Sequence, residues 1–203
     1  MCGKTTKAAA SVSNPPPLAA DQDMGHYIGA SEVRVVPTSL TIRTALPTDA
    51  EALTAYIAAI VAERLPVLFA REAPPAPEQV AKMIARNAED ERSALFVAVE
   101  KGAILGMLDF SGHARPQQRH VGSFGMSVAR SARGRGIGTR LLRALYTFAK
   151  EHGYRKLELE VFATNGPAIV LYESHGFVHE GRRRGAVMVG EEAVDLLLMG
   201  KGI

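Results

Sequence analysis

The sequence predicts an α/β (α+β) fold, in which a mixed, mostly antiparallel central sheet of about seven strands is flanked by helices on both faces. Strand and helix patterns follow one another in the order β-α-α-β-β-β-α-β-α-β-β, without an internal repeat. The chain has 203 residues, of which 47% are apolar and 22% charged. One domain with a sizeable core is therefore expected.

The composition also bears on where the protein works. Residues 1–39 carry no hydrophobic period and include three consecutive prolines, which predicts a flexible or loosely docked tail before a domain at 40–203. Cys2 is the only cysteine, which excludes an intrachain disulfide and favours a reducing compartment. No apolar run approaches the length of about 18 residues that a membrane span needs, and no signal-peptide pattern precedes the domain. We expect a cytoplasmic protein without a membrane partner.

The first half of the domain predicts three strands and two helices. They are expected at about 40–43 (strand), 48–64 (helix), 78–87 (helix), 94–100 (strand) and 104–111 (strand). Thr48 or Asp49 is a suitable N-cap, and a proline-rich link separates the two helices. Lys101-Gly102 is typical of a hairpin turn between the later strands, and a polar loop follows at 113–119.

The second half predicts four strands and two helices. They are expected at 124–128 (strand), about 136–151 (helix), 156–162 (strand), 167–175 (helix), about 177–189 (strand) and 193–199 (strand). Apolar positions of the longer helix share one face, and Gly153 and Gly176 follow the two helices as stop signals.

Residues 123–143, SFGMSVARSARGRGIGTRLLR, carry the most specific chemical information. An apolar run ends at Val128, and a glycine-rich turn over 133–138 leads into the longer helix. The first N–H groups of a helix have no intrahelical partner, and the helix dipole adds partial positive charge there. Glycine at 136 and 138 lets phosphate oxygens approach these amides. The turn therefore indicates a site for a phosphate-bearing cofactor.

Two other uses of this region are less favoured. A dinucleotide-binding fold needs G-x-G-x-x-G, whereas the chain has Gly134-x-Gly136-x-Gly138 and no matching second half. Arginines gather at 130–143 and 182–184, but no aromatic residues interleave with them as in a single-strand binder. We expect these arginines to serve a small anionic ligand, with no nucleic-acid partner.

Two motifs resemble the GNAT family of N-acetyltransferases. Arg133-x-x-Gly136-x-Gly138, after Met126-Ser127-Val128, is similar to the acetyl-CoA motif Gln/Arg-x-x-Gly-x-Gly/Ala. Residues 165–177, NGPAIVLYESHGF, resemble the family's N-x-x-A-x-x-L-Y-x-x-x-G-F at the expected distance. The resemblance covers about 40–200 and implies the GNAT acyl-CoA N-acyltransferase fold, with acetyl-CoA as co-substrate.

The resemblance also implies a cofactor site. The strand ending at Val128 would separate from its neighbour, and the pantetheine arm would pair with its backbone like an extra strand. A backbone N–H there would face the thioester oxygen, where negative charge develops. Asn165 would bond the pantetheine or its loop, or cap a helix. The expected cofactor-binding residues are Met126, Ser127, Val128, Arg133, Gly134, Arg135, Gly136, Ile137, Gly138, Thr139 and Asn165.

Catalysis requires a proton donor and a proton acceptor. Many relatives use the tyrosine at the position of Tyr172 as the acid that protonates the departing CoA thiolate; the alternative is an aromatic packed on the sheet. A base must take a proton from the attacking ammonium. His120 is our preferred base, because it heads the cofactor strand and a histidine pKa lies near neutrality. Asp109 and Glu160 are the other candidates.

The sequence therefore predicts an N-acetyltransferase that moves the acetyl group of acetyl-CoA to a primary amine. No cysteine lies within 40–203 to carry an acyl group, so we expect direct attack in a ternary complex. A non-catalytic acyl-CoA-binding regulatory protein is the alternative. No metal site is expected, since the histidines lack ligand spacing, and a homodimer is compatible with the sequence.

The acceptor is expected to be a small amine or an amino-acid-like molecule. Its pocket would be formed by residues of 46–90, 112–120 and 181–193. Three acidic residues are available to attract a cation: Glu51, Glu63 and Glu72. Acetylation of a protein N-terminus or lysine is the alternative.

Overall fold

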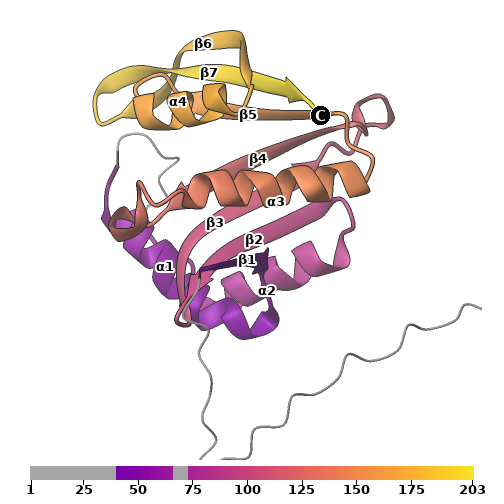
Figure 1. The fold of residues 1–203 in the computed structure, drawn as a ribbon. Coiled ribbons are helices and arrows are strands. Elements are labelled where there is room, and N and C mark those ends of the chain that lie inside the picture. The colour runs from indigo at the N-terminus through magenta and orange to yellow at the C-terminus, as the bar shows by residue number, and fades with distance from the viewer. Residues whose placement is uncertain (1–39, 66–72) are drawn as a thin grey trace, which may run out of the picture. The chain divides into compact units, whose positions relative to one another are not determined.

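The computed structural model describes residues 40–65 and 73–203, which form a sheet with helices on both faces (Figure 1). The strands are β1 (Thr41–Thr44), β2 (Ser93–Glu100), β3 (Ala103–Gly112), β4 (Val121–Val128), β5 (Lys156–Phe162), β6 (Val178–Val189) and β7 (Glu192–Gly202). The helices are α1 (Ala50–Ala62), α2 (Pro77–Glu89), α3 (Ile137–Glu151) and α4 (Gly166–Ser174). The predicted order of elements is confirmed, whereas the predicted tail at 1–39 lies outside the described residues.

The seven strands of the described part are ordered β1-β2-β3-β4-β5-β7-β6. β4 and β5 are parallel, and every other neighbouring pair is antiparallel, which confirms the mixed, mostly antiparallel sheet. β4 begins at Val121 rather than at the predicted Phe124. Gly122 and Ser123 weaken the apolar pattern there, but both pair with β3 on one side and β5 on the other.

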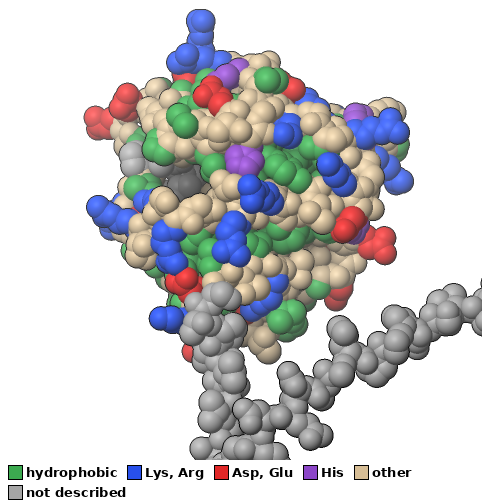
Figure 2. Space-filling model, in the orientation of Figure 1, with side chains coloured by type: hydrophobic (Ala, Val, Ile, Leu, Met, Phe, Trp, Pro, Cys, Tyr) green, Lys and Arg blue, Asp and Glu red, His purple; other side chains and the backbone are tan. Residues whose placement is uncertain are grey.

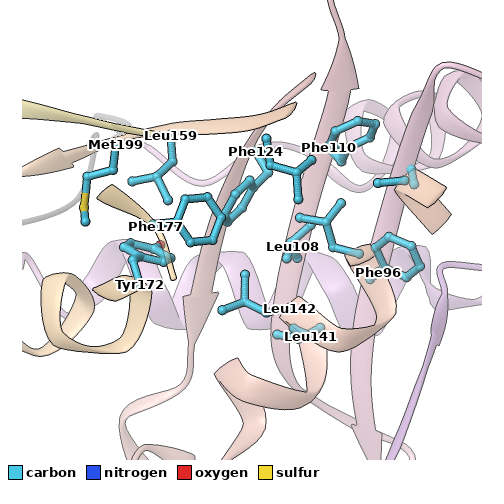
Figure 3. Packing of buried hydrophobic residues seen from close by; sticks show 14 of the residues in the cluster. Phe96, Leu108, Phe110, Phe124, Leu141, Leu142, Leu159, Tyr172, Phe177 and Met199 are labelled. Atoms are coloured by element: carbon cyan, nitrogen blue, oxygen red, sulfur yellow. The ribbon is translucent and has the colours of Figure 1, made fainter. Parts of the chain in front are cut away.

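Each face of the sheet has its own apolar core. Beneath α3 and α4 the larger members are Phe96, Leu108, Phe110, Phe124, Leu141, Leu142, Leu145, Tyr172 and Phe177 (Figure 3). Beneath α1 and α2 they are Leu53, Tyr56, Val80, Ile84, Leu95 and Val97. Successive side chains of a strand point to opposite faces. Leu108 therefore packs beneath α3, while Met107 and Asp109 lie on the α1 and α2 face.

The start of α1 differs from the prediction in one respect. Asp49 occupies the N-cap position, but its carboxylate does not cap the helix. It accepts hydrogen bonds from Arg43 at 2.6 and 2.8 Å and from the N–H of Leu46 at 2.7 Å. The Arg43 guanidinium lowers the pKa of this buried carboxyl. Asp49 thus ties β1 to the start of α1. None of the helices in the described ranges is both long and apolar enough to cross a membrane.

Candidate active site

The parallel strands β4 and β5 separate along their length and open the sheet (Figure 1). They pair only where Val121–Ser123 faces Lys156–Glu158. Beyond this point β4 continues along β3 to Val128, and β5 continues along β7 to Phe162. Each strand therefore keeps its outer neighbour and loses its inner one. This is the separation that the family resemblance implies.

The backbone of β4 presents free groups to this opening. Successive residues of an antiparallel strand direct their N–H and C=O groups to opposite sides. The N–H of Ala129 donates to the carbonyl of Leu105 in β3 at 2.9 Å, which sets the alternation. Met126 and Val128 consequently direct their N–H and C=O groups away from β3. Both lie where backbone binding of a cofactor requires them.

Ser127 has a different environment from its two neighbours. It lies opposite Met107 in β3, so its N–H and C=O face that strand rather than the opening. Its hydroxyl hydrogen-bonds the hydroxyl of Tyr56 at 2.8 Å. Burial raises the pKa of Tyr56 to about 12, so this phenol stays protonated. The placement of Ser127 favours a role in holding α1 against β4 over the expected backbone contact with the cofactor.

The glycine-rich turn has the backbone geometry that an anion site needs. Gly134 and Gly136 have φ of 75° and 73°, a left-handed conformation that disfavours a Cβ. The first helical hydrogen bond runs from the N–H of Arg140 to the carbonyl of Gly136, so the three preceding N–H groups have no helical acceptor. They belong to Ile137, Gly138 and Thr139.

Gly138 is required for packing as well. A Cβ at this position would lie 2.9 Å from Cδ2 of Leu171 in α4 and 3.5 Å from Cε of Met126. Its lack of a side chain therefore lets α4 approach the start of α3. Thr139 also contacts this region, because its hydroxyl lies 3.3 Å from Nε2 of His175. The two sequence motifs thus meet in space.

The two arginines of the glycine-rich turn are held by carboxylates. Arg133 pairs with Glu63 at 2.5 Å and also donates from Nε to the carbonyl of Val128 at 3.0 Å. Arg135 pairs with Glu100 at 2.6 Å. Figure 2 shows Lys and Arg side chains spread over the face that carries α3 rather than gathered at one point. These pairs reduce the positive charge that either arginine offers to a phosphate.

A cavity of about 960 Å³ occupies the opening between β4 and β5. Its lining includes Met126 and Ser127 from β4, Asn165 at the start of α4, and Tyr172 within α4. Residues from α1, β3, the loop before β4, β5, β6 and β7 complete it. The open edge of β4 and the second sequence motif therefore face one space.

Tyr172 is held rigidly at this cavity. Its side chain is only 6% exposed, and its ring packs edge-on against Phe124 and Phe177, with centroids 5.9 and 5.8 Å apart (Figure 3). Burial raises the pKa of Tyr172 to about 12. The phenol is therefore protonated throughout the neutral range and is available as a donor. Both the packing and the donor readings of this residue are compatible with the structure.

Asn165 is the N-cap of α4, as one reading of the sequence predicted. Its Oδ1 accepts a hydrogen bond from the N–H of Ala168 at 3.3 Å, and Pro167 follows in the first turn. Asn165 and Ala168 both line the cavity. The capped helix start is therefore part of the wall, and the cap positions Tyr172 further along the same helix.

His120 lies away from the groups that meet at the cavity. The imidazole is exposed just before β4 and is not part of the cavity lining. The backbone carbonyl of His120 accepts hydrogen bonds from the N–H groups of Arg155 and Lys156, at the end where β4 and β5 are still paired. Because the strands separate only beyond Ser123, the first residue before β4 is remote from the opening. This placement does not support His120 as the base.

Four carboxylates line the cavity instead, and three of them are paired. Glu158 lies 2.9 Å from His113, Glu180 lies 2.7 Å from Lys156, and Glu160 contacts Arg183. Asp109, by contrast, has no ion-pair or hydrogen-bond partner for its carboxylate among the described residues. Burial raises the pKa of Asp109, and the nearby positive charge of Arg86 opposes that shift.

Two of these pairs were not anticipated from the sequence. His113 comes from the loop before β4, and Arg183 comes from β6, so each partner is far from its carboxylate along the chain. The only available signal was the alternation of Glu158 and Glu160 on one face of β5. Strand alternation predicts a shared face but does not identify what lies across from it.

The segments expected to form the acceptor pocket contribute to the cavity in part. Ile60, His113 and Arg183 line it, one from each segment. The acidic residues expected to attract a cation do not: Glu63 is paired with Arg133, Glu51 is exposed on α1, and Glu72 lies outside the described residues. Among residues 40–65 and 73–203, no group of three or more His, Cys, Asp or Glu side chains could hold a metal ion.

Comparison with known proteins identifies the class. The model of the acetyltransferase (GNAT) family matches residues 54–177, and the chain belongs to that family. The chain is 28% identical to YwnH of Bacillus subtilis, which bears the name of a phosphinothricin acetyltransferase, over 80% of this chain and 98% of that protein. It is 32% identical to the L-amino acid N-acetyltransferase AaaT of Escherichia coli, over 52% of this chain and 65% of that protein.

Solved structures show the same fold. A GNAT acetyltransferase of Streptococcus pneumoniae superposes with a TM-score of 0.73 at 27% identity, covering 81% of this chain and 99% of that one. The yncA structure of Salmonella typhimurium, solved with acetyl-CoA as its cofactor, superposes with a TM-score of 0.73 at 19% identity, covering 81% and 94%. The second likeness shows the fold alone.

The protein is thus an acetyl-CoA-dependent N-acetyltransferase of the GNAT family. The residues present fit acetyl-CoA. Pantetheine carries amide groups that can pair with the backbone of Met126 and with the N–H of Val128, which face away from β3, and a pyrophosphate can accept from the N–H groups at the start of α3 that have no helical acceptor. Acetyl-CoA supplies the activated acyl group, and the chain supplies its orientation.

Proposed function

We propose that this enzyme acetylates the primary amine of a small molecule by direct attack on acetyl-CoA in a ternary complex. The observation that carries this proposal is the cavity of about 960 Å³ at the separation of β4 and β5. The open backbone edge, a protonated tyrosine and an unpaired carboxylate all line this one cavity. A volume of this size suits a small ligand beside a thioester. The names of the two relatives, which refer to phosphinothricin and L-amino acids, support the same substrate class.

Asp109 is the proton acceptor in this proposal. The attacking nitrogen must lose a proton, and an ionised carboxylate within reach can take it. The other three carboxylates of the cavity already have partners: Glu158 lies beside His113, Glu180 pairs with Lys156, and Glu160 pairs with Arg183. Burial raises the pKa of Asp109, which makes it a stronger base than an exposed aspartate. Asp109 therefore replaces His120 as our candidate.

Tyr172 is the proton donor. As the bond from the acyl carbon to sulfur breaks, the phenol donates a hydrogen bond to the thiolate and then its proton. Its pKa of about 12 keeps the proton in place before the reaction and returns one from water afterwards. The ammonium loses two protons on its way to the amide. Asp109 takes the first before the attack, and the second leaves the nitrogen as the C–S bond breaks and returns through water to the Tyr172 phenolate, whose proton has gone to sulfur. Asp109 then releases its proton to water, so that one proton is released in each turnover. The N–H groups of β4 that face the opening can stabilise the charge on the carbonyl oxygen.

Direct transfer rather than a covalent acyl-enzyme follows from the side chains available. Cys2 is the only cysteine of the chain, and it lies outside the domain that carries the cavity. No thiol in 40–203 can therefore carry the acetyl group. Acetyl-CoA and the amine must then be bound at the same time, and the opening between β4 and β5 has room for both.

The first experiment is calorimetric titration of the full chain with acetyl-CoA, with NAD as the control ligand. Micromolar binding of acetyl-CoA alone, followed by thiol release with small primary amines, is the expected result. Binding without thiol release from small amines, peptides or proteins supports the alternative of an acyl-CoA-binding regulatory protein. Release with a peptide N-terminus or lysine but with no small amine contradicts the proposed acceptor class.

The expected cytoplasmic location, homodimer and lack of a nucleic-acid partner are further parts of this proposal. Gel-filtration at several concentrations tests the homodimer. Retention of duplex DNA at low salt contradicts the absence of nucleic-acid binding.

A further inference from the structure

A second, smaller cavity of about 340 Å³ adjoins the large one on the side of α2. Asp109 and Ser111 of β3 line both cavities. The remaining wall comes mainly from one face of α2, including Lys82, Arg86 and Asn87. The proposed proton acceptor therefore stands between a space for the reaction and a space with basic walls.

The two cations of this wall are free to bind an anion. Lys82 and Arg86 are four residues apart on α2, so they lie one above the other on the same side of the helix. Neither forms an ion pair with another described residue, and both are exposed. The basic residues near the large cavity differ, since Arg183 and Lys156 are paired with glutamates. Asp109 is the one carboxylate that lines the small cavity.

Asn87 adds an unsatisfied acceptor to the same wall. Its Nδ2 donates to the carbonyl of Met83 at 3.0 Å, whereas Oδ1 is buried without a hydrogen-bond partner among the described residues. Buried polar atoms usually have a partner, so an unpaired one needs an explanation. A ligand carboxylate has no donor for this oxygen, whereas an ammonium on the same ligand has three N–H groups, and Asn87 lines the same cavity as Asp109.

We propose that the small cavity binds the anionic group of the acceptor, which makes the acceptor a zwitterion of the amino-acid class. Its ammonium lies at Asp109, and its carboxylate lies against Arg86 and Lys82. A guanidinium binds a carboxylate through two parallel hydrogen bonds, which fixes orientation as well as affinity. The ammonium is thereby held at the boundary of the large cavity, facing the thioester. This inference rests on the proposed function and specifies its substrate class.

The proposal separates amino acids from other primary amines. A protein lysine has no carboxylate near its amine, and a protein N-terminus carries an amide in that place. A polyamine brings a second cation toward Lys82 and Arg86, which is repulsive. Each of these acceptors leaves the two cations of α2 without a partner.

The test compares acids with their own amides. Thiol release from acetyl-CoA is measured with L-alanine, L-leucine, L-methionine, L-glutamate and L-histidine, each beside the corresponding amide. For the best acid, kcat/KM is expected to exceed that of its amide by about tenfold or more, the size of one charge-assisted hydrogen bond. The α-amine of an amino-acid amide is a weaker base than that of the free acid, so a larger share of it is deprotonated at neutral pH. Amine protonation alone would therefore favour the amide, which is the opposite of the expected result.

Variants on α2 locate the effect. Arg86→Gln is expected to raise KM for the acid by about tenfold with little change in kcat, and to leave the amide unaffected, so the ratio falls toward one. Lys82→Gln acts in the same direction. Lys150→Gln, which removes an exposed charge near the end of α3, is the matched control and keeps the wild-type ratio.

The possible outcomes distinguish a failure of the anion subsite from a failure of the proposed acetyltransferase function. Equal rates for acids and amides in the wild type, or an unchanged ratio in Arg86→Gln, overturn the anion subsite and leave the acetyltransferase in place. Binding of acetyl-CoA without release from any amine overturns both. Circular dichroism of each variant verifies that a lost rate is not a lost fold.

Discussion

The two halves of the candidate site are built from different kinds of group. The cofactor half consists of backbone groups: the edge of β4 at Met126 and Val128 that faces away from β3, and the N–H groups after Gly136 that have no helical acceptor. The acceptor half consists largely of side chains from α1, α2, β3, β5 and β6, and Asp109 lines both of its cavities. One half is nearly continuous in sequence, whereas the other is assembled from distant segments.

This difference teaches how each half tolerates change. A backbone site depends on conformation and on the absence of obstructing atoms, so few side chains carry its energy. A side-chain site depends on the charges of its residues and on which of those charges form ion pairs. Glu158, Glu160 and Glu180 each have a basic side chain as partner, whereas Asp109 has no such partner among the described residues. Substitutions should therefore affect the two halves through separate observables, namely the Kd of acetyl-CoA and the kinetics toward the amine.

Tyr172→Phe is expected to have the largest effect. Removing the hydroxyl leaves the ring packing in place and removes the donor to the thiolate, so kcat should fall about 100-fold or more. The Kd of acetyl-CoA from calorimetry should stay within about threefold, since the cofactor half is made by backbone. Unchanged turnover would return Tyr172 to a packing role.

Asp109→Asn tests the acceptor half of the site. The variant should lose about 100-fold in kcat/KM, and the fall of wild-type activity at acid pH should disappear with it, because the carboxyl must be ionised to accept a proton. Glu160→Gln is the matched variant, and its acid limb should remain. If Asp109→Asn keeps that limb, the base is another group.

The same substitution should stabilise the fold. The pKa of Asp109 is higher in the folded chain than in the unfolded chain, so the native state binds more protons in the interval between the two values. Stability therefore decreases as pH rises through that interval, and the loss persists at neutral pH. Asn removes this cost. We expect a higher Tm than wild type at pH 7 and a smaller difference below about pH 4, measured by differential scanning calorimetry.

Two glycine substitutions separate the halves directly. Gly136→Ala forces a Cβ into a left-handed conformation, at a cost of about 1 kcal/mol, and should weaken acetyl-CoA about tenfold by shifting the turn. Gly125 of β4 lies opposite Asp109 in β3, lines the large cavity and has open space for a Cβ. Gly125→Ala should therefore raise KM for the amine about threefold and leave the Kd of acetyl-CoA unchanged. If both variants changed the Kd of acetyl-CoA and the KM for the amine to the same extent, the division into a cofactor half and an acceptor half would be wrong.

Arg135→Gln is expected to have the smallest effect. Its guanidinium is exposed and already paired with Glu100, so acetyl-CoA should bind less than about threefold more weakly, and the difference should shrink in high salt. A loss greater than about tenfold would mean that this side chain binds the phosphates directly. The cofactor half would then depend on side chains as well as backbone.

Local patterns accounted for most of the fold and for the cofactor half. The apolar run before Val128, the glycines at 134, 136 and 138, and the cap at Asn165 each act within a few residues of themselves. Backbone geometry of that range is encoded locally, which is why the turn and the α4 cap match expectation. Even here Gly138 needed the tertiary structure, since its packing partner Leu171 belongs to another helix.

The base could not be chosen in the same way. Its place at the head of the cofactor strand and the general suitability of histidine as a base favoured His120. Whether a residue reaches the opening depends on where β4 and β5 separate, and no local pattern encodes that point. Asp109 was one of several acidic candidates. Asp109 differs from the other candidates because its carboxylate has no ion-pair or hydrogen-bond partner among the described residues. Such partners depend on the three-dimensional structure and cannot be identified from the sequence.

The sequence by itself determined the order of elements and the glycine-rich turn before α3, because these follow from short-range periodicity, glycine conformation and helix ends, and its two motifs identified the class of protein by resemblance. Only the tertiary structure decided which carboxylates have partners, which backbone groups stay open, and that Lys82 and Arg86 line a cavity together with Asp109. Those properties depend on pairwise distances between segments up to about a hundred residues apart, and electrostatic interactions act through those distances.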